Sequence, residues 1–331
     1  MKVPRIAILL ALLGACSEPT PPPGQVPPLE AVSYTLLGSG KIAFERIAPL
    51  YHAVYLVDPV AQTSTVVASG VFNGPALSPD GQQLAVTAYT DPNSSLDVYA
   101  HRMDGSGRRR IGTYPGDDGV PSWTVDGNGL TFLRSHESGP EKVITEARAS
   151  DGVAQRTITL RRADACSQLF VGDSEDRVEV ASNGLIATPC GLNQLVILSG
   201  DGVRVGVYSA ALGSLIIGFA WSPDGSKLAV MEMAAGSAGL PVSQTLRIVP
   251  ANGGSPRQVF TMALELTQNG RYAGANDSAI CWLKGVDRLL VAILHEARRY
   301  SQLWVVNEDG TGLTRVTTAP QVTDRSVSCS R

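Results

Sequence analysis

The chain has 331 residues, with 27 Lys and Arg against 30 Asp and Glu, and a formal net charge of −3. Only 17% of the residues are charged and 44% are hydrophobic, which excludes a disordered tail and a highly charged nucleic-acid-binding protein. The 34 glycines and 21 prolines occur without a collagen-like triplet and indicate a globular protein with many short strands.

The N-terminus has the features of a bacterial export signal. Lys2 and Arg5 flank a short apolar segment, residues 6–13, which is far below the roughly 20 residues of a membrane span. Residues 13–16, LGAC, resemble a lipobox, in which the cysteine is lipidated before cleavage. We therefore expect a lipoprotein signal peptide over residues 1–15 and a lipid anchor at Cys16, which would bind the membrane stably. The alternative is an ordinary signal peptide with an incidental cysteine.

The segment after Cys16 predicts a spacer. Ser17 follows the cysteine, and lipoproteins of this kind without Asp at that position are usually sorted to the outer membrane. The resemblance thus implies a bacterial envelope protein, in the outer membrane and facing the periplasm or the cell surface. Residues 17–29 contain six prolines, so we expect an extended linker over residues 16–35. Removal of residues 1–15 changes the formal charge to −3 − 2 = −5, which argues against a nucleic-acid partner.

A short phrase recurs along residues 36–331. Residues 76–86 read ALSPDGQQLAV and residues 220–230 read AWSPDGSKLAV, and a weaker copy at residues 122–132 reads SWTVDGNGLTF. With three degenerate copies there are six units, spaced by 41, 46, 57, 41 and 60 residues at the following glycines: Gly40, Gly81, Gly127, Gly184, Gly225 and Gly285.

The phrase predicts a tight hairpin. Proline presets φ at the first turn position, aspartate suits the second, and glycine takes the left-handed position that follows. We interpret the Asp-Gly pairs of the three copies that match the phrase best as structural turns only: Asp80, Gly81, Asp126, Gly127, Asp224 and Gly225. Each unit then has a third strand, a second turn such as Asp104-Gly105, and a last strand, so it contains four strands in a meander.

Repeated four-stranded units of this length predict a β-propeller. The S-P-D-G phrase, the apolar strand after it, the D-G-x-G turn and the Thr-rich last strand resemble the repeat of TolB-type six-bladed propellers. This resemblance covers about residues 36–331 and is best in the second and fifth units. It implies an all-β, six-bladed β-propeller with four-stranded antiparallel blades, and it says little about function.

The end of the chain predicts how the ring closes. Residues 324–331 read as a strand without a following turn, so we expect the C-terminal strand to be the innermost strand of blade one. The alignment of the units then places Cys281 and Cys329 on neighbouring inner strands, which predicts a disulfide between them. Cys166 and Cys190 flank the insertion between units three and four and form the second expected disulfide. Buried free thiols are the alternative.

The sequence offers little chemistry. His52, His136 and His295 fall between the second and third strands of their units, and we treat them as weak metal or acid–base candidates and, by preference, as exposed loop residues. No G-x-S-x-G motif and no phosphate-binding loop occurs, so no catalytic or cofactor-binding residue is expected. Three tryptophans at equivalent inner positions indicate core between blades, or alternatively an aromatic ring for a sugar or a peptide: Trp123, Trp221 and Trp282.

The favoured hypothesis is a membrane-anchored, non-enzymatic binding or scaffold propeller of the bacterial envelope, which docks a protein or an envelope polymer through its loop face. TolB-type proteins contact a peptidoglycan-associated lipoprotein, but they carry an α/β domain where this chain has its proline-rich segment. The alternative is a metal-dependent propeller enzyme, such as a polysaccharide lyase or a lactone hydrolase.

Overall fold

The recurring Pro-Asp-Gly phrase closes the hairpin between the first and second strands of a blade. At the second copy, the main-chain N of Gly81 donates to Ser78 O at 2.8 Å, and Gly81 has a left-handed φ of 67°. The Asp80 carboxylate accepts from the Ser78 hydroxyl at 2.5 Å and from the main chain two residues on at 3.0 Å. Asp126 and Asp224 accept equivalent hydroxyl bonds at 2.6 Å each. The repeated residues therefore form turns, as predicted.

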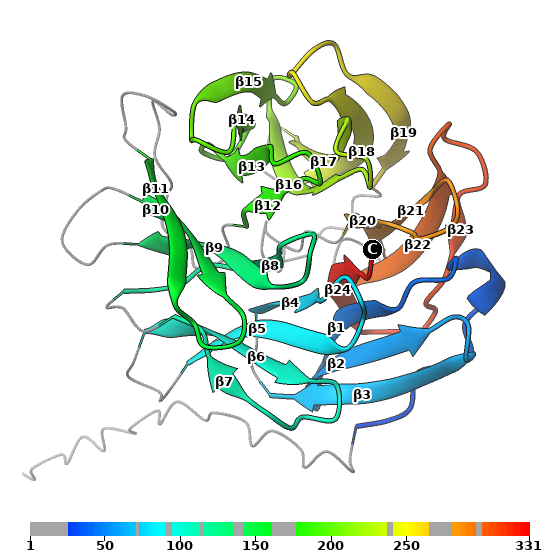
Figure 1. Cartoon of the computed structure of the whole chain (residues 1–331). Coiled ribbons are helices and arrows are strands. Elements are labelled where there is room, and N and C mark those ends of the chain that lie inside the picture. Colours follow the sequence, from blue (N-terminus) through cyan, green and yellow to red (C-terminus); the bar gives the residue numbers. More distant parts are fainter. Residues whose placement is uncertain are drawn as a thin grey trace, which may run out of the picture.

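The computed structural model describes residues 26–70, 73–89, 95–112, 116–135, 142–160, 177–236, 241–264, 280–295 and 300–331. Six four-stranded antiparallel sheets surround a common centre (Figure 1), which confirms the predicted six-bladed β-propeller. The one helix in the described part is a 3₁₀ turn, η2 (Tyr34–Leu36).

The strands of each blade, from the innermost to the outermost, have the following bounds. Blade one has β24 (Thr323–Cys329), β1 (Ile42–Ala48), β2 (Tyr51–Asp58) and β3 (Thr63–Ser69); blade two has β4 (Asn73–Leu77), β5 (Gln83–Tyr89), β6 (Leu96–Arg102) and β7 (Arg109–Arg110). Blade three has β8 (Ser122–Trp123), β9 (Gly129–Ser135), β10 (Lys142–Arg148) and β11 (Ala154–Leu160); blade four has β12 (Glu179–Val180), β13 (Ile186–Pro189), β14 (Gln194–Leu198) and β15 (Arg204–Ser209). Blade five has β16 (Ser214–Trp221), β17 (Lys227–Ala235), β18 (Pro241–Pro250) and β19 (Arg257–Ala263); blade six has β20 (Ile280–Trp282), β21 (Arg288–His295), β22 (Tyr300–Asn307) and β23 (Thr314–Arg315).

The cores lie between neighbouring blades. Leu84 and Val86 of β5, for example, pack against Ala43 and Val54 of blade one in one buried cluster. Alternating apolar residues on successive strands supply both faces of each blade, because side chains along a strand point to opposite sides of the sheet. In the described part of the chain, no helix has the length and apolar character needed to cross a membrane.

The last strand closes the ring. β24 pairs antiparallel with β1, with Cys329 opposite Ile42, and so becomes the innermost strand of blade one, as predicted. The structure contains the disulfide between Cys281 of β20 and Cys329, whose Cα atoms are 5.8 Å apart, and this bond joins blade six to blade one. Cys190 is disulfide-bonded as well, but Cys166 lies outside the described residues, so that pairing stays a prediction.

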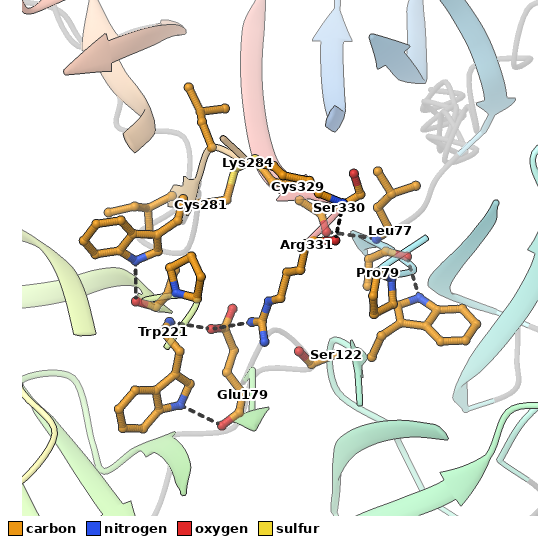
Figure 2. Close-up of a pocket in the computed structure, with 18 of the residues that line it drawn as sticks. Leu77, Pro79, Ser122, Glu179, Trp221, Cys281, Lys284, Cys329, Ser330 and Arg331 are labelled. Atoms are coloured by element: carbon orange, nitrogen blue, oxygen red, sulfur yellow. Dashed lines mark hydrogen bonds and ion pairs between the residues drawn. A yellow bond between two sulfur atoms is a disulfide. The ribbon is translucent and has the colours of Figure 1, made fainter. Parts of the chain in front are cut away.

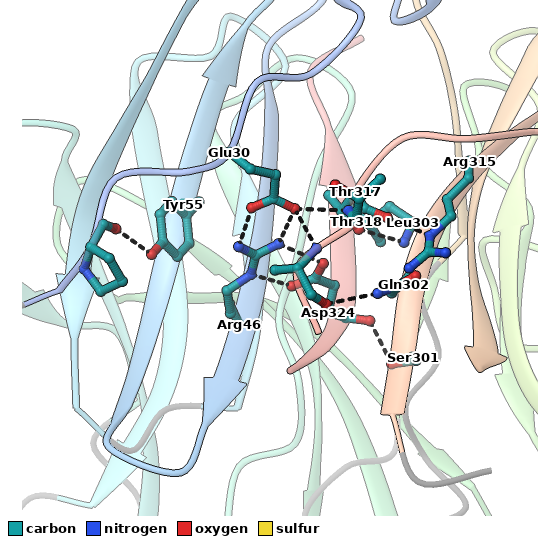
Figure 3. Close-up of polar contacts among 12 residues, drawn as sticks. Glu30, Arg46, Tyr55, Ser301, Gln302, Leu303, Arg315, Thr317, Thr318 and Asp324 are labelled. Carbon is teal, nitrogen blue, oxygen red and sulfur yellow. Dashed lines mark hydrogen bonds and ion pairs between the residues drawn. The ribbon is translucent and has the colours of Figure 1, made fainter. Parts of the chain in front are cut away.

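Residues 26–37, here called the strap, cover the seam between blades six and one (Figure 3). The Glu30 carboxylate accepts from both terminal nitrogens of Arg46 at 2.6 and 3.0 Å, and from the main-chain N of Thr318 at 2.9 Å. The Tyr55 hydroxyl donates to Pro27 O at 2.7 Å. The described part of the expected linker, residues 26–35, thus lies on the propeller, while residues 16–25 lie outside the described residues, so the linker stays a prediction there.

Candidate functional site at the channel mouth

The six inner strands enclose a channel, and a cavity of about 290 Å³ lies at the end of this channel where the Pro-Asp-Gly turns are (Figure 2). Six residues at equivalent positions, one from each blade, line it: Ala76, Ser122, Glu179, Ala220, Cys281 and Ser328. Five of these side chains are small. Glu179 is the one charged member of the set.

The tryptophans tie neighbouring blades together. Their indole Nε1 atoms donate to main-chain carbonyls of the preceding blade: Trp123 to Ala76 at 2.9 Å, Trp221 to Glu179 at 3.1 Å and Trp282 to Ala220 at 3.3 Å. Trp123 and Trp221 are buried, and the Lys227 ammonium lies 5.3 Å from the centre of the half-buried Trp282 ring. The buried rings of Trp123 and Trp221 therefore act as core between blades, and Lys227 lies over the ring of Trp282.

Glu179 begins β12 and holds its buried carboxylate in the channel wall. Its side chain is 2% exposed. One oxygen accepts the main-chain N–H of Trp221 at 3.1 Å, and the other lies 3.0 Å from Nη2 of Arg177. A buried carboxylate needs such partners, because an unpaired charge out of water is costly.

Arg331 follows β24 and extends across the cavity toward Glu179 (Figure 2). Its guanidinium is held by two long contacts: Nη1 to Val180 O at 3.4 Å and Nη2 to the Glu179 carboxylate at 3.9 Å. Burial lowers the pKa of Arg331, and the Glu179 charge opposes that effect. Lys284, on the rim, donates to the main-chain O of Arg331 at 2.9 Å. Among the described residues, the Arg331 guanidinium therefore uses only part of its hydrogen-bonding capacity.

The histidine candidates do not converge in the described structure. His52 lies at the start of β2, and its Nε2 is 3.4 Å from a Glu45 oxygen that also accepts from Arg325 Nε at 2.9 Å. His295 ends β21, and only its backbone is described; His136 lies outside the described residues. Within the described ranges, no group of three or more His, Cys, Asp or Glu side chains is placed to hold a metal ion.

The lipidation candidate Cys16 also lies outside the described residues, so the anchor stays a prediction. Sequence reasoning missed Arg177, Glu179 and Arg331. A signal for Glu179 was present, since aligning the six units leaves one glutamate among small residues at a single inner-strand position. No sequence pattern predicts that Arg177 and Arg331 lie next to the Glu179 carboxylate.

No family profile and no curated protein sequence matches this chain. The fold matches solved structures, among them TolB from Acinetobacter baumannii, with 17% identity and a TM-score of 0.64 over 89% of this chain and 67% of that chain. A TolB-type structure from Agrobacterium tumefaciens matches with 14% identity and a TM-score of 0.52, over 88% of this chain and 98% of that chain. The protein is therefore a β-propeller of the TolB-like, six-bladed type.

Enzymes share this architecture. An oligogalacturonate lyase in complex with manganese matches with 13% identity and a TM-score of 0.50, over 88% of this chain and 77% of that chain. At such identities the likeness shows the fold alone, and a function has to be argued from the site.

Proposed function

We propose that this protein is a lipid-anchored propeller of the bacterial envelope that docks a partner protein at the mouth of its central channel and catalyses no reaction. The observation that carries the proposal is the cavity at the Pro-Asp-Gly end, which combines a concave shape with charged groups whose hydrogen-bonding capacity is only partly used. A concave site with a few convergent polar groups is the usual form of a binding site.

A protein partner is favoured over an envelope polymer. Sugar recognition commonly uses exposed aromatic faces, and the cavity's tryptophans are engaged between blades. The TolB-like fold and the predicted export signal agree with a binding role in the envelope. A metal-dependent lyase or hydrolase is less well supported, because His52 is engaged with Glu45 and lies toward the opposite end of its blade from the cavity.

Photo-cross-linking in the native bacterium tests the docking site. A benzophenone amino acid replaces Asp287, an exposed rim residue, or Leu212, an exposed residue of the connection between β15 and β16 at the opposite end of the channel. We expect one discrete protein cross-linked from position 287 and little or none from position 212. Equal labelling from both positions, or none from position 287, would contradict docking at this mouth.

Membrane fractionation of a Cys16→Ala variant tests the anchor. We expect the wild-type chain in the membrane fraction and the variant in the soluble envelope fraction, since the anchor would be the acylated cysteine. A variant that stays with the membrane would show that Cys16 is not the anchor.

A further inference from the structure

Charged groups of both signs line the channel mouth: Arg177, Lys284 and Arg331, with Glu179 and the exposed rim residue Asp287. Lys284 already donates to the main-chain O of Arg331. The Glu179 carboxylate has Arg177 and the Trp221 main chain as partners, and Arg331 lies 3.9 Å from it. Each guanidinium carries five N–H donors, so the two arginines have more donors than this one carboxylate can satisfy.

Donors in this cavity lack good acceptors. The buried Nε of Arg177 has no hydrogen-bond partner among the described residues. Within the described ranges, the Arg331 guanidinium makes only its two long contacts, at 3.4 and 3.9 Å. The Arg177 Nε is too deeply buried for a ligand to reach, so the donor that is open to a ligand is the Arg331 guanidinium, whose side chain is 29% exposed.

We infer that the channel mouth recognises the carboxylate of an acidic side chain, Asp or Glu, which a loop of the docked partner inserts between Arg177 and Arg331. This inference rests on the proposed docking function and specifies its chemistry. Guanidinium groups form short, strong, often bidentate bonds with carboxylates. An apolar group would leave the donors unpaired, and a cation would meet two arginines. The volume of about 290 Å³ suits one or two inserted side chains, while the rest of the partner lies on the rim.

Titration calorimetry with two synthetic peptides tests the inference. Blocked Gly-Ser-Glu-Ser-Gly and its Gln counterpart are titrated into residues 17–331, the chain without the predicted signal peptide and anchor cysteine, here called the mature chain. We expect the Glu peptide to bind at least about tenfold more tightly, since a guanidinium forms stronger hydrogen bonds with a carboxylate than with a neutral amide oxygen. Equal affinity of the two peptides would overturn the inference. Tighter binding of free succinate than of the Glu peptide would also overturn it, because the site would then serve a small carboxylic acid.

Variants connect the effect to the cavity. Arg331→Ala should remove the preference for Glu over Gln, and it should leave the fold intact because Arg331 makes only long side-chain contacts. Arg148→Ala removes one positive charge at an exposed pair with Asp151 and should leave the preference unchanged. A preference that survives Arg331→Ala, or that is lost equally in Arg148→Ala, would contradict the assignment.

The cross-linking experiment separates this inference from the docking function. Capture of a partner from position 287, together with equal affinity for the two peptides, would support docking at the channel mouth and contradict recognition of a carboxylate there. If no protein is captured specifically from position 287, the proposed docking function is itself contradicted.

Discussion

Arg46 of β1 donates two hydrogen bonds to Asp324 of β24, from Nε at 2.6 Å and from Nη2 at 2.8 Å, across 278 residues of sequence. The same guanidinium binds Glu30 of the strap, so a single buried side chain joins the strap, the second strand of blade one and the strand that closes the ring (Figure 3). Burial would raise the pKa of Glu30, but the hydrogen bonds and charge of Arg46 lower it to about 2. The ring is thus closed by three kinds of bond: the β24–β1 pairing, the Cys281–Cys329 disulfide and this ion pair.

Replacement of Arg46 should weaken the closure strongly. Arg46→Met leaves the fully buried Asp324 without its cation, and breaking one side of a buried pair costs about 3–5 kcal/mol in the free energy of unfolding. Urea unfolding of the variant measures this loss, with the exposed Arg148→Ala as the control, for which a change within about 0.5 kcal/mol is expected. A loss below about 1 kcal/mol for Arg46→Met would show that the ion pair does not hold the seam.

The bonds from the tryptophans to the preceding blades should differ in strength. Trp221→Phe removes the Nε1 donor, so the main-chain O of Glu179 loses this bond in a buried place and keeps only its strand pairing with β13, at a cost of about 0.5–1.5 kcal/mol. Trp282→Phe should cost less, because Trp282 is only half-buried and its bond is longer, at 3.3 Å. Thermal or urea unfolding of both variants shows which loses more stability. A larger loss for Trp282→Phe than for Trp221→Phe would contradict this difference in bond strength.

Asp118 should give the stability a distinctive pH dependence. Burial, opposed by the Arg134 charge, raises the pKa of Asp118 from 3.8 to about 6 in the folded protein. The folded state then binds the proton more tightly than the unfolded state, so this group lowers the free energy of unfolding as pH rises from about 4 to about 6, by up to about 3 kcal/mol.

Unfolding of the wild type and of Asp118→Asn at pH 4, 5, 6 and 7 isolates this contribution. Glu30, whose lowered pKa acts in the opposite direction below pH 4.5, is present in both proteins and cancels in the difference. The advantage of Asp118→Asn over the wild type should grow between pH 4 and pH 6. Parallel curves would show that Asp118 does not titrate in this range.

Metal analysis addresses the enzymatic alternative. The mature chain, purified without a chelator, should contain no stoichiometric divalent ion by plasma mass spectrometry. One ion per chain that disappears in His136→Ala and His295→Ala would overturn the preference for a binding protein and favour a lyase or a hydrolase.

The propeller was predictable because its signal is local and repeated. Each Pro-Asp-Gly turn depends on about four consecutive residues, and the Asp80 and Asp224 copies have the same hydrogen bonds. The pairing of Cys281 with Cys329 was predictable for a related reason, since the alignment of the units places both on neighbouring inner strands.

The strap and the channel charges were not predictable, because they depend on contacts between distant residues. Glu30 belongs to a stretch whose composition is that of a spacer, and its role follows from its bonds to Arg46 and to Thr318, the latter 288 positions away and brought near only when the ring closes. Glu179 and Arg331 are 152 positions apart and meet only across the channel.

Hydrogen exchange of the mature chain, alone and with the partner captured from position 287, tests whether the partner docks at the channel mouth. We expect protection of main-chain amides at the channel mouth, in residues 80–82, 224–226, 283–287 and 329–331, and no change in the loops at the opposite end, such as residues 191–193 and 211–213. Protection confined to the opposite loops, with the channel mouth exchanging as in the free protein, would contradict docking at the channel.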